Sequence, residues 1–276
     1  MVVKNQSLRD VLEFKSWRIY RSFEPNWFYT TVGLLSLMIF CLLAGTIDER
    51  LLNGVSVWNK PFKFTLSFAV YFVTLLIIAR YLPVGYLRVG TGRLIAGSIT
   101  LVIVLEMAYI IIKAAMGEAS HFNFTTDLHR IMYMLMGVGA VWTVMAPLFY
   151  AWAIGLNNAK NDPMVLSIII GLGLSFVLGG GFGGYLGGQT SHWVNAAATD
   201  ATGIWLFNWV TDGGDLRVAH FFGLHAMQAI PLFALLLPKQ LSQNAACALV
   251  ALFSATYTAF SVHTFIQAVQ GQPFIS

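Results

Sequence analysis

The stretch RLIAGSITLVIVLEMAYIIIKAAM (93–116) decides the fold of this chain. Between Arg93 and Lys113 the only charged residue is Glu106, and most of the others are apolar. A helix needs about 20 such residues to cross the hydrocarbon core of a bilayer. The stretch therefore predicts a transmembrane helix that carries one carboxylate inside the membrane.

The rest of the chain repeats this pattern. Of its 276 residues, 57% are hydrophobic and 10% are charged, whereas an average soluble domain is about 45–50% apolar and about 25% charged. Seven apolar segments are long enough to span a bilayer, at 27–47, 62–83, 93–116, 127–153, 164–185, 217–237 and 245–268. The sequence predicts an all-α integral membrane bundle of seven transmembrane helices, which forms one domain over 27–276 with a long loop at 186–216.

Residues 1–26 precede the first span and have an amphipathic pattern. Leu8, Leu12 and Ile19 recur at helical spacing, while Arg9 and Lys15 fall elsewhere. This pattern is typical of a helix that lies on a membrane surface. A short solvated helix packed on the loops is the alternative interpretation.

Lysine and arginine lie near the ends of the spans, where they orient a membrane protein. Ten of them fall on the side of the N-terminus and six on the opposite side. The positive-inside rule then predicts a cytoplasmic N-terminus and a periplasmic C-terminus. No basic run with interleaved aromatic residues suggests a nucleic-acid surface, so we expect the lipid bilayer and not nucleic acid as the partner.

This topology places every histidine of the chain on the outer side of the membrane. The six are His121, His129, His192, His220, His225 and His263. Histidines at helix ends often only bond to carbonyl groups or water. Their one-sided distribution nevertheless predicts an outward-facing site.

A transition-metal site is the first interpretation of this distribution. At 1.5 Å per helical residue, Glu106, His225 and His263 reach comparable depth, and His121 and His129 lie above them. Imidazole and carboxylate groups are common ligands of Fe, Cu and Zn. We therefore expect these five residues to be candidate metal ligands.

Haem b is the second interpretation, because axial histidines hold this group in many redox proteins. His220 would bind the iron, and Arg217, Lys60 and Lys63 would bind the propionates. Either group would suit a membrane oxidoreductase that acts in redox or electron transfer. A quinone or a periplasmic electron carrier would then be the partner.

Two other functions remain open at this point. A small-solute or ion transporter would use Glu106, Lys113 and His225 as a polar path, with helices kinked at Pro147 and Pro231 as moving parts. Glu106 and Lys113 are two helical turns apart and share a face. A metal-dependent membrane hydrolase is the other alternative, and a purely structural subunit is also compatible with the sequence.

Local signals predict details of the helix ends and of the packing. Thr126 or Asp127 can cap the fourth span. Gly180, Gly184 and Gly188 are four residues apart, a spacing that lets helices approach closely.

Three runs resemble an uncharacterised group of bacterial polytopic inner-membrane proteins. They are VWNKPFKFTLSF (57–68), GEASHFNF (117–124) and GDLRVAHFFGLHAMQAIPL (214–232). The resemblance implies a multi-pass protein of the bacterial inner (cytoplasmic) membrane, and it implies no activity.

Overall fold

Seven transmembrane helices form the fold. A computed structural model of the chain describes residues 21–159 and 161–275. Within these residues, seven helical stretches are long and apolar enough to cross a membrane, at Pro25–Ile47, Asn59–Tyr81, Gly90–Met116, Asp127–Asn157, Pro163–Gly187, Leu216–Leu236 and Gln243–Val269. This confirms the predicted bundle, whereas its orientation and the membrane that holds it stay predictions. The amphipathic helix predicted within 1–26 lies mostly outside the described residues.

Several spans are divided into shorter elements. The helices are α3 (Pro25–Ile47), α4 (Asn59–Ile78), α5 (Gly90–Met116), α6 (Asp127–Met145), α7 (Pro147–Asn157), α8 (Pro163–Leu174), α9 (Gly181–Gly187), α10 (Leu216–Leu236) and α11 (Gln243–Val269). The π-helix η3 (Ser175–Gly180) joins α8 to α9, and the 3-10 turns η1 (Ala79–Tyr81) and η2 (Tyr86–Arg88) lie between α4 and α5. The fourth span divides at Pro147 as expected, because proline cannot donate the next helical hydrogen bond. Pro231 lies inside α10, which continues past it.

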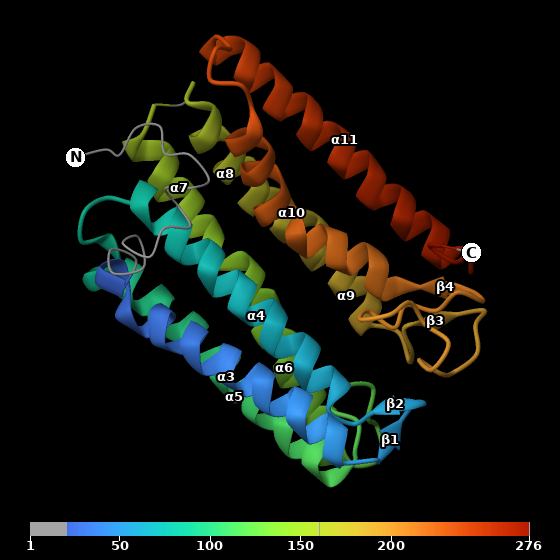
Figure 1. The fold of residues 1–276 in the computed structure, drawn as a ribbon. Coiled ribbons are helices and arrows are strands. Elements are labelled where there is room, and N and C mark those ends of the chain that lie inside the picture. Colours follow the sequence, from blue (N-terminus) through green and yellow to red (C-terminus); the bar gives the residue numbers. More distant parts are fainter. Residues whose placement is uncertain (1–20, 160, 276) are drawn as a thin grey trace.

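Two short antiparallel strand pairs mark one end of the bundle. They are β1 (Leu51–Leu52) with β2 (Val55–Ser56), and β3 (Trp193–Val194) with β4 (Gly214–Asp215). Figure 1 shows both pairs and the C-terminus at the same end, which we call the strand end. The charge count predicts that this end faces outward.

The tip of the first hairpin holds the long loop in place. Asn53 and Gly54 form its turn, and both have positive φ angles (53° and 81°), as two-residue hairpin turns require. The carbonyl oxygen of Asn53 accepts hydrogen bonds from the Asp200 amide at 2.8 Å and from the Thr199 hydroxyl at 3.1 Å. Two segments that are distant in sequence therefore form one cover over the strand end.

Apolar side chains fill the interior and also face outward. Trp27 is fully buried, packs against Phe72 and Tyr150, and donates a hydrogen bond to the Ala96 carbonyl at 3.3 Å. Large apolar residues such as Leu94 are exposed on the outside of the bundle (74% for Leu94). Such an apolar exterior is stable in lipid and would be unfavourable in water.

A close contact between helical backbones lies where α10 crosses η3. A Cβ atom on Gly223 would lie 2.6 Å from the Gly179 nitrogen, and one on Gly179 would lie 2.9 Å from the Leu224 nitrogen. The backbones can meet only because both residues lack a side chain. The expected contact through Gly184 was wrong, because nothing lies within 4 Å of the place where its Cβ would be.

Candidate functional site

The histidines gather in the strand-end half of the fold, but they do not converge on one point. His121 and His192 lie in loops at the strand end, and His129, His220 and His225 lie in the first turns of helices that begin there; His263 lies near the strand-end terminus of α11. Among the described residues, no three His, Cys, Asp or Glu side chains form a group that could hold a metal ion. The one-sided distribution is therefore real, while a common site is absent from the described part.

The expected metal ligands Glu106, His225 and His263 lie in different surroundings. His263 is on the exposed face of α11. The ring of His225 packs on Phe221 at 4.2 Å between centroids, and its Nδ1 lies 3.2 Å from the amide oxygen of Gln228. Glu106 is 8% exposed. Within the described residues they belong to no group of three His, Cys, Asp or Glu side chains that could hold a metal ion, so a shared metal ion stays a prediction.

Two of the residues expected to hold haem, His220 and Arg217, are already bonded to protein groups. His220 donates from Nδ1 to the Gly179 carbonyl at 3.0 Å, and its Cε1 would lie 2.5 Å from a Cβ on Gly183. The Arg217 guanidinium is paired with Asp215. Both side chains would have to leave these partners to bind haem, and haem binding stays a prediction from the sequence.

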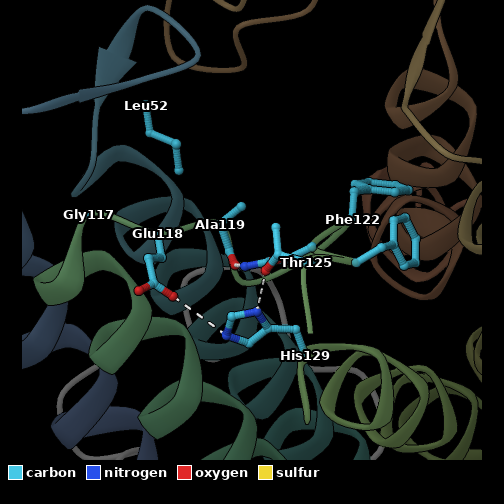
Figure 2. A pocket seen from close by; sticks show the side chains of 9 residues that line it. Leu52, Gly117, Glu118, Ala119, Phe122, Thr125 and His129 are labelled. Carbon is cyan, nitrogen blue, oxygen red and sulfur yellow. Dashed lines mark hydrogen bonds and ion pairs between the residues drawn. The ribbon is translucent and has the colours of Figure 1, made fainter. Parts of the chain in front are cut away.

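His129 belongs to a polar chain beside a surface pocket of about 440 Å³. Lys113 Nζ lies 2.7 Å from both Glu118 Oε2 and His129 Nε2, and Thr125 Oγ1 lies 2.8 Å from His129 Nδ1. Figure 2 shows Glu118 and Thr125 reaching the two nitrogens of the ring. The backbone amide of His129 donates to Thr126, which confirms the predicted cap.

The direction of these hydrogen bonds argues against a hydrolytic nucleophile. An ammonium group can only donate, so His129 Nε2 accepts from Lys113, and Nδ1 carries the proton that is donated to Thr125. The Thr125 hydroxyl in turn donates to Asn123 Oδ1 at 2.7 Å. His129 therefore cannot remove a proton from Thr125 in this arrangement.

Arg217 locks the long loop onto the start of α10. Its Nη2 donates to Asp215 at 2.6 Å, to Asp200 at 2.8 Å and to the Asn208 carbonyl at 2.6 Å. The side chains of Asp215 and Asp200 are 1% and 10% exposed. Charge-assisted bonds with such burial are strong, and we call Arg217, Asp215, Asp200 and His192 the loop latch.

Lys63 extends the latch to α4. Its Nζ donates to the Phe207 carbonyl at 3.1 Å and to Asn208 Oδ1 at 3.0 Å, and Asn59 also donates to that oxygen. Lys63 and Asn59 thereby tie the first turns of α4 to the long loop. A structural role explains both residues.

The latch perturbs two titratable groups in the loop. Burial holds the pKa of His192 below its ordinary value, although the ring bonds to Asp200 at 3.3 Å. Burial alone would raise the pKa of Asp200, but the hydrogen bond from His192 and the charge of Arg217 together hold it below its ordinary value. Near neutral pH the latch thus contains a neutral imidazole and a carboxylate.

We expect the loop to open more readily as the pH falls from 7 to 5. An unperturbed histidine has a pKa of about 6.5. Because the folded-state pKa of His192 is lower, the opened state binds the proton first, and latch stability decreases as the pH falls below about 6.5. Trp209 in this loop is 6% exposed. The rate of chymotrypsin cleavage after Trp209, divided by the rate for unfolded protein at the same pH, should therefore increase as the pH falls. His192→Gln should weaken this pH dependence, and His121→Gln should leave it unchanged. If the cleavage rate varies equally with pH in wild type and in His192→Gln, the explanation is wrong.

Glu106 and Lys60 interact electrostatically without a direct bond in the described part of the chain. They attract each other electrostatically, yet no hydrogen bond or ion pair within the described residues reaches the Glu106 carboxylate or the Lys60 ammonium. The Lys60 Nζ instead lies 5.7 Å from the centroid of the Phe64 ring. Tyr109, one turn from Glu106 on α5, also has a buried hydroxyl with no partner in the described part.

His121 lies in the loop between α5 and α6 and interacts electrostatically with Lys60. Its ring packs against Phe64 at 5.4 Å and Tyr133 at 6.0 Å between centroids. Burial and the charge of Lys60 hold the pKa of His121 well below its ordinary range. Glu106 and His121 thus both interact with Lys60.

A second polar contact crosses between α4 and α10 farther from the strand end. Gln228 Nε2 donates to Thr74 Oγ1 at 3.0 Å, and Gln228 Oε1 accepts from His225. Polar side chains thus occur at two depths along α4.

Sequence reasoning missed several members of these groups. Asp215 could have been found, since it stands immediately before an apolar helical run, where a cap is expected. Thr74 and Gln228 are polar residues inside apolar spans, which is a readable signal. Asp200 carries no local signal, because only the fold brings it to its neighbours, whereas Tyr109 could have been noted three residues from Glu106 on the same helix.

Comparison with known proteins identifies no family for this chain. No family model matches the chain, and neither a curated protein nor a solved structure matches it. The resemblance of three runs to bacterial inner-membrane proteins stays a prediction.

Proposed function

We propose that this protein transports a small ion across the membrane, with Glu106 and Lys60 at the centre of the path. The proposal rests on one observation: Glu106 and Lys60 attract each other without a direct hydrogen bond or ion pair in the described residues. Glu106 is 8% exposed in the middle of the α5 span, and neither charged group has a hydrogen-bonding partner among the described residues. An ionisable group inside a membrane is costly, and such groups commonly mark ion pathways.

A purely structural role does not account for this couple. The structural charges of the same protein are directly bonded, as in Lys113 with Glu118 at 2.7 Å and Arg217 with Asp215 at 2.6 Å. A buried charge without hydrogen bonds destabilises the folded state. Glu106 is buried in this way, while Lys60 is half-buried, and a couple of this kind without a direct bond suits a site that exchanges its occupant.

The neighbouring helices provide elements that suit transport. Gln228 and Thr74 bridge α4 and α10 at greater depth. The fifth span contains the π-helix η3, and such irregular turns are frequent at functional sites.

The redox and hydrolase interpretations gain no support from the described side chains. A bound metal or haem, an electron carrier and a hydrolytic reaction remain predictions from the sequence. We therefore place ion transport ahead of them.

Electrical recording from proteoliposomes tests the proposal. Purified protein is reconstituted, and gradients of H⁺, Na⁺, K⁺ and Cl⁻ are imposed one at a time. We expect at least one gradient to drive a current that protein-free liposomes lack, and we expect Lys60→Met to reduce it several-fold. Lys239→Met, at the opposite end, should retain the current. If none of the four gradients drives a current through correctly folded protein, the proposal is wrong.

A further inference from the structure

The surroundings of Glu106 restrict which ion the path can carry. The charged group that acts on Glu106 is the Lys60 ammonium on α4. Lys60 in turn interacts with Lys63, Arg217, Asp200 and the neutral His121. Near the carboxylate there is therefore one positive charge, and the aromatic ring of Phe64 lies beside that charge.

These groups do not suit a metal cation or chloride. Hard cations are held by several oxygen ligands, often carboxylates and carbonyls. Glu106 supplies two oxygens, and the described residues form no group of three His, Cys, Asp or Glu side chains around it. The Lys60 ammonium would repel a metal cation, while the Glu106 carboxylate would repel chloride.

We propose that the transported ion is the proton and that Glu106 is the residue that binds and releases it. This inference rests on the proposed transport function and specifies its substrate. A proton needs no coordination shell, because it forms a covalent O–H bond with one carboxylate oxygen. Lys60 stabilises the ionised form of Glu106 between transfers, which keeps the site ready to accept the next proton.

Tyr109 provides a route from the strand end to Glu106. The two residues are three apart on α5 and share a face, and Tyr109 lies on the strand-end side. Its hydroxyl is buried without a partner among the described residues. A hydroxyl can accept one proton and donate another, so Tyr109 would pass a proton toward Glu106 once water reaches its hydroxyl.

The transfer balances without any redox partner. A hydronium ion gives its proton to the path and becomes water, and an O–H bond forms on Glu106, which becomes a neutral carboxylic acid. Release toward the opposite end breaks that bond and restores the carboxylate. One positive charge crosses the membrane in each cycle.

Ion substitution in the same proteoliposomes tests the inference. We expect the current to persist when Na⁺ and K⁺ are replaced by N-methyl-D-glucamine and Cl⁻ by gluconate, and its reversal potential to follow the imposed pH difference alone. A reversal potential that follows Na⁺, K⁺ or Cl⁻ would overturn the proton assignment and leave ion transport standing. Absence of current under all gradients would instead overturn the proposed function.

The relay is tested by Tyr109→Phe, which removes only the hydroxyl. We expect a several-fold slower proton current with the same reversal potential. Tyr29→Phe, at a tyrosine that is 59% exposed, is the matched control and should behave as wild type. An unchanged current in Tyr109→Phe would remove Tyr109 from the path.

Discussion

Glu106→Gln should lower the ion current of the reconstituted protein by about tenfold or more, equivalent to about 1.4 kcal/mol or more on the barrier. Glutamine has nearly the same size and can fill the same space on α5. It cannot bind and release a proton, and it leaves Lys60 without a counter-charge. The measurement is the initial current per reconstituted protein under a fixed pH gradient.

Asp127→Asn is the matched control for this variant. The side chain of Asp127 is 91% exposed at the start of α6, so the same chemical change there should leave the current intact. Elution as a single species in size-exclusion chromatography would establish that Glu106→Gln is folded. Wild-type current in folded Glu106→Gln would show that the carboxylate is not on the path.

Gly223→Val should have the largest effect on folding. The new Cβ would lie 2.6 Å from the Gly179 nitrogen and 2.8 Å from its Cα, and both atoms belong to the backbone of η3. Overpacking of this kind costs about 1–3 kcal/mol and sometimes more. We expect a clear fall in the thermal unfolding midpoint in detergent, or loss of the folded fraction.

Gly173→Val separates this effect from a general loss of glycine. Nothing lies within 4 Å of a Cβ at Gly173, which is also in a membrane helix. This variant should unfold near the wild-type temperature. Equal unfolding temperatures for the two variants would contradict the close crossing of α10 over η3.

The fold could be predicted from local properties of the sequence. In lipid the backbone must satisfy its own hydrogen bonds, so a long apolar segment forms a membrane-spanning helix. The segment around Glu106 could therefore be predicted from its composition. The break at Pro147 and the cap at Thr126 also follow from local chemistry. The contact between Gly179 and Gly223 could not be predicted, because it depends on the angle at which two distant helices cross.

The site could be predicted only in part. Because ionisable groups in a membrane are costly, Glu106 stood out from its own span. Depth along each helix was also informative, since the histidines do lie in the strand-end half. Depth does not specify the direction of a side chain around the helix axis, however. His263 therefore lies exposed on α11, while His225 bonds to Gln228. The charged group that acts on Glu106 is Lys60 and not a histidine.

Infrared difference spectroscopy of the protein in lipid, recorded between two pH values, tests the central role of Glu106 most directly. Protonation of a carboxylate creates a carboxylic acid carbonyl band whose frequency reports its surroundings. We expect a titrating band typical of an acid in an apolar environment, absent from Glu106→Gln, displaced in its pH midpoint in Lys60→Met and unchanged in Asp127→Asn. If the band persists in Glu106→Gln, or if its midpoint does not respond to Lys60→Met, Glu106 and Lys60 do not form the proton-binding centre.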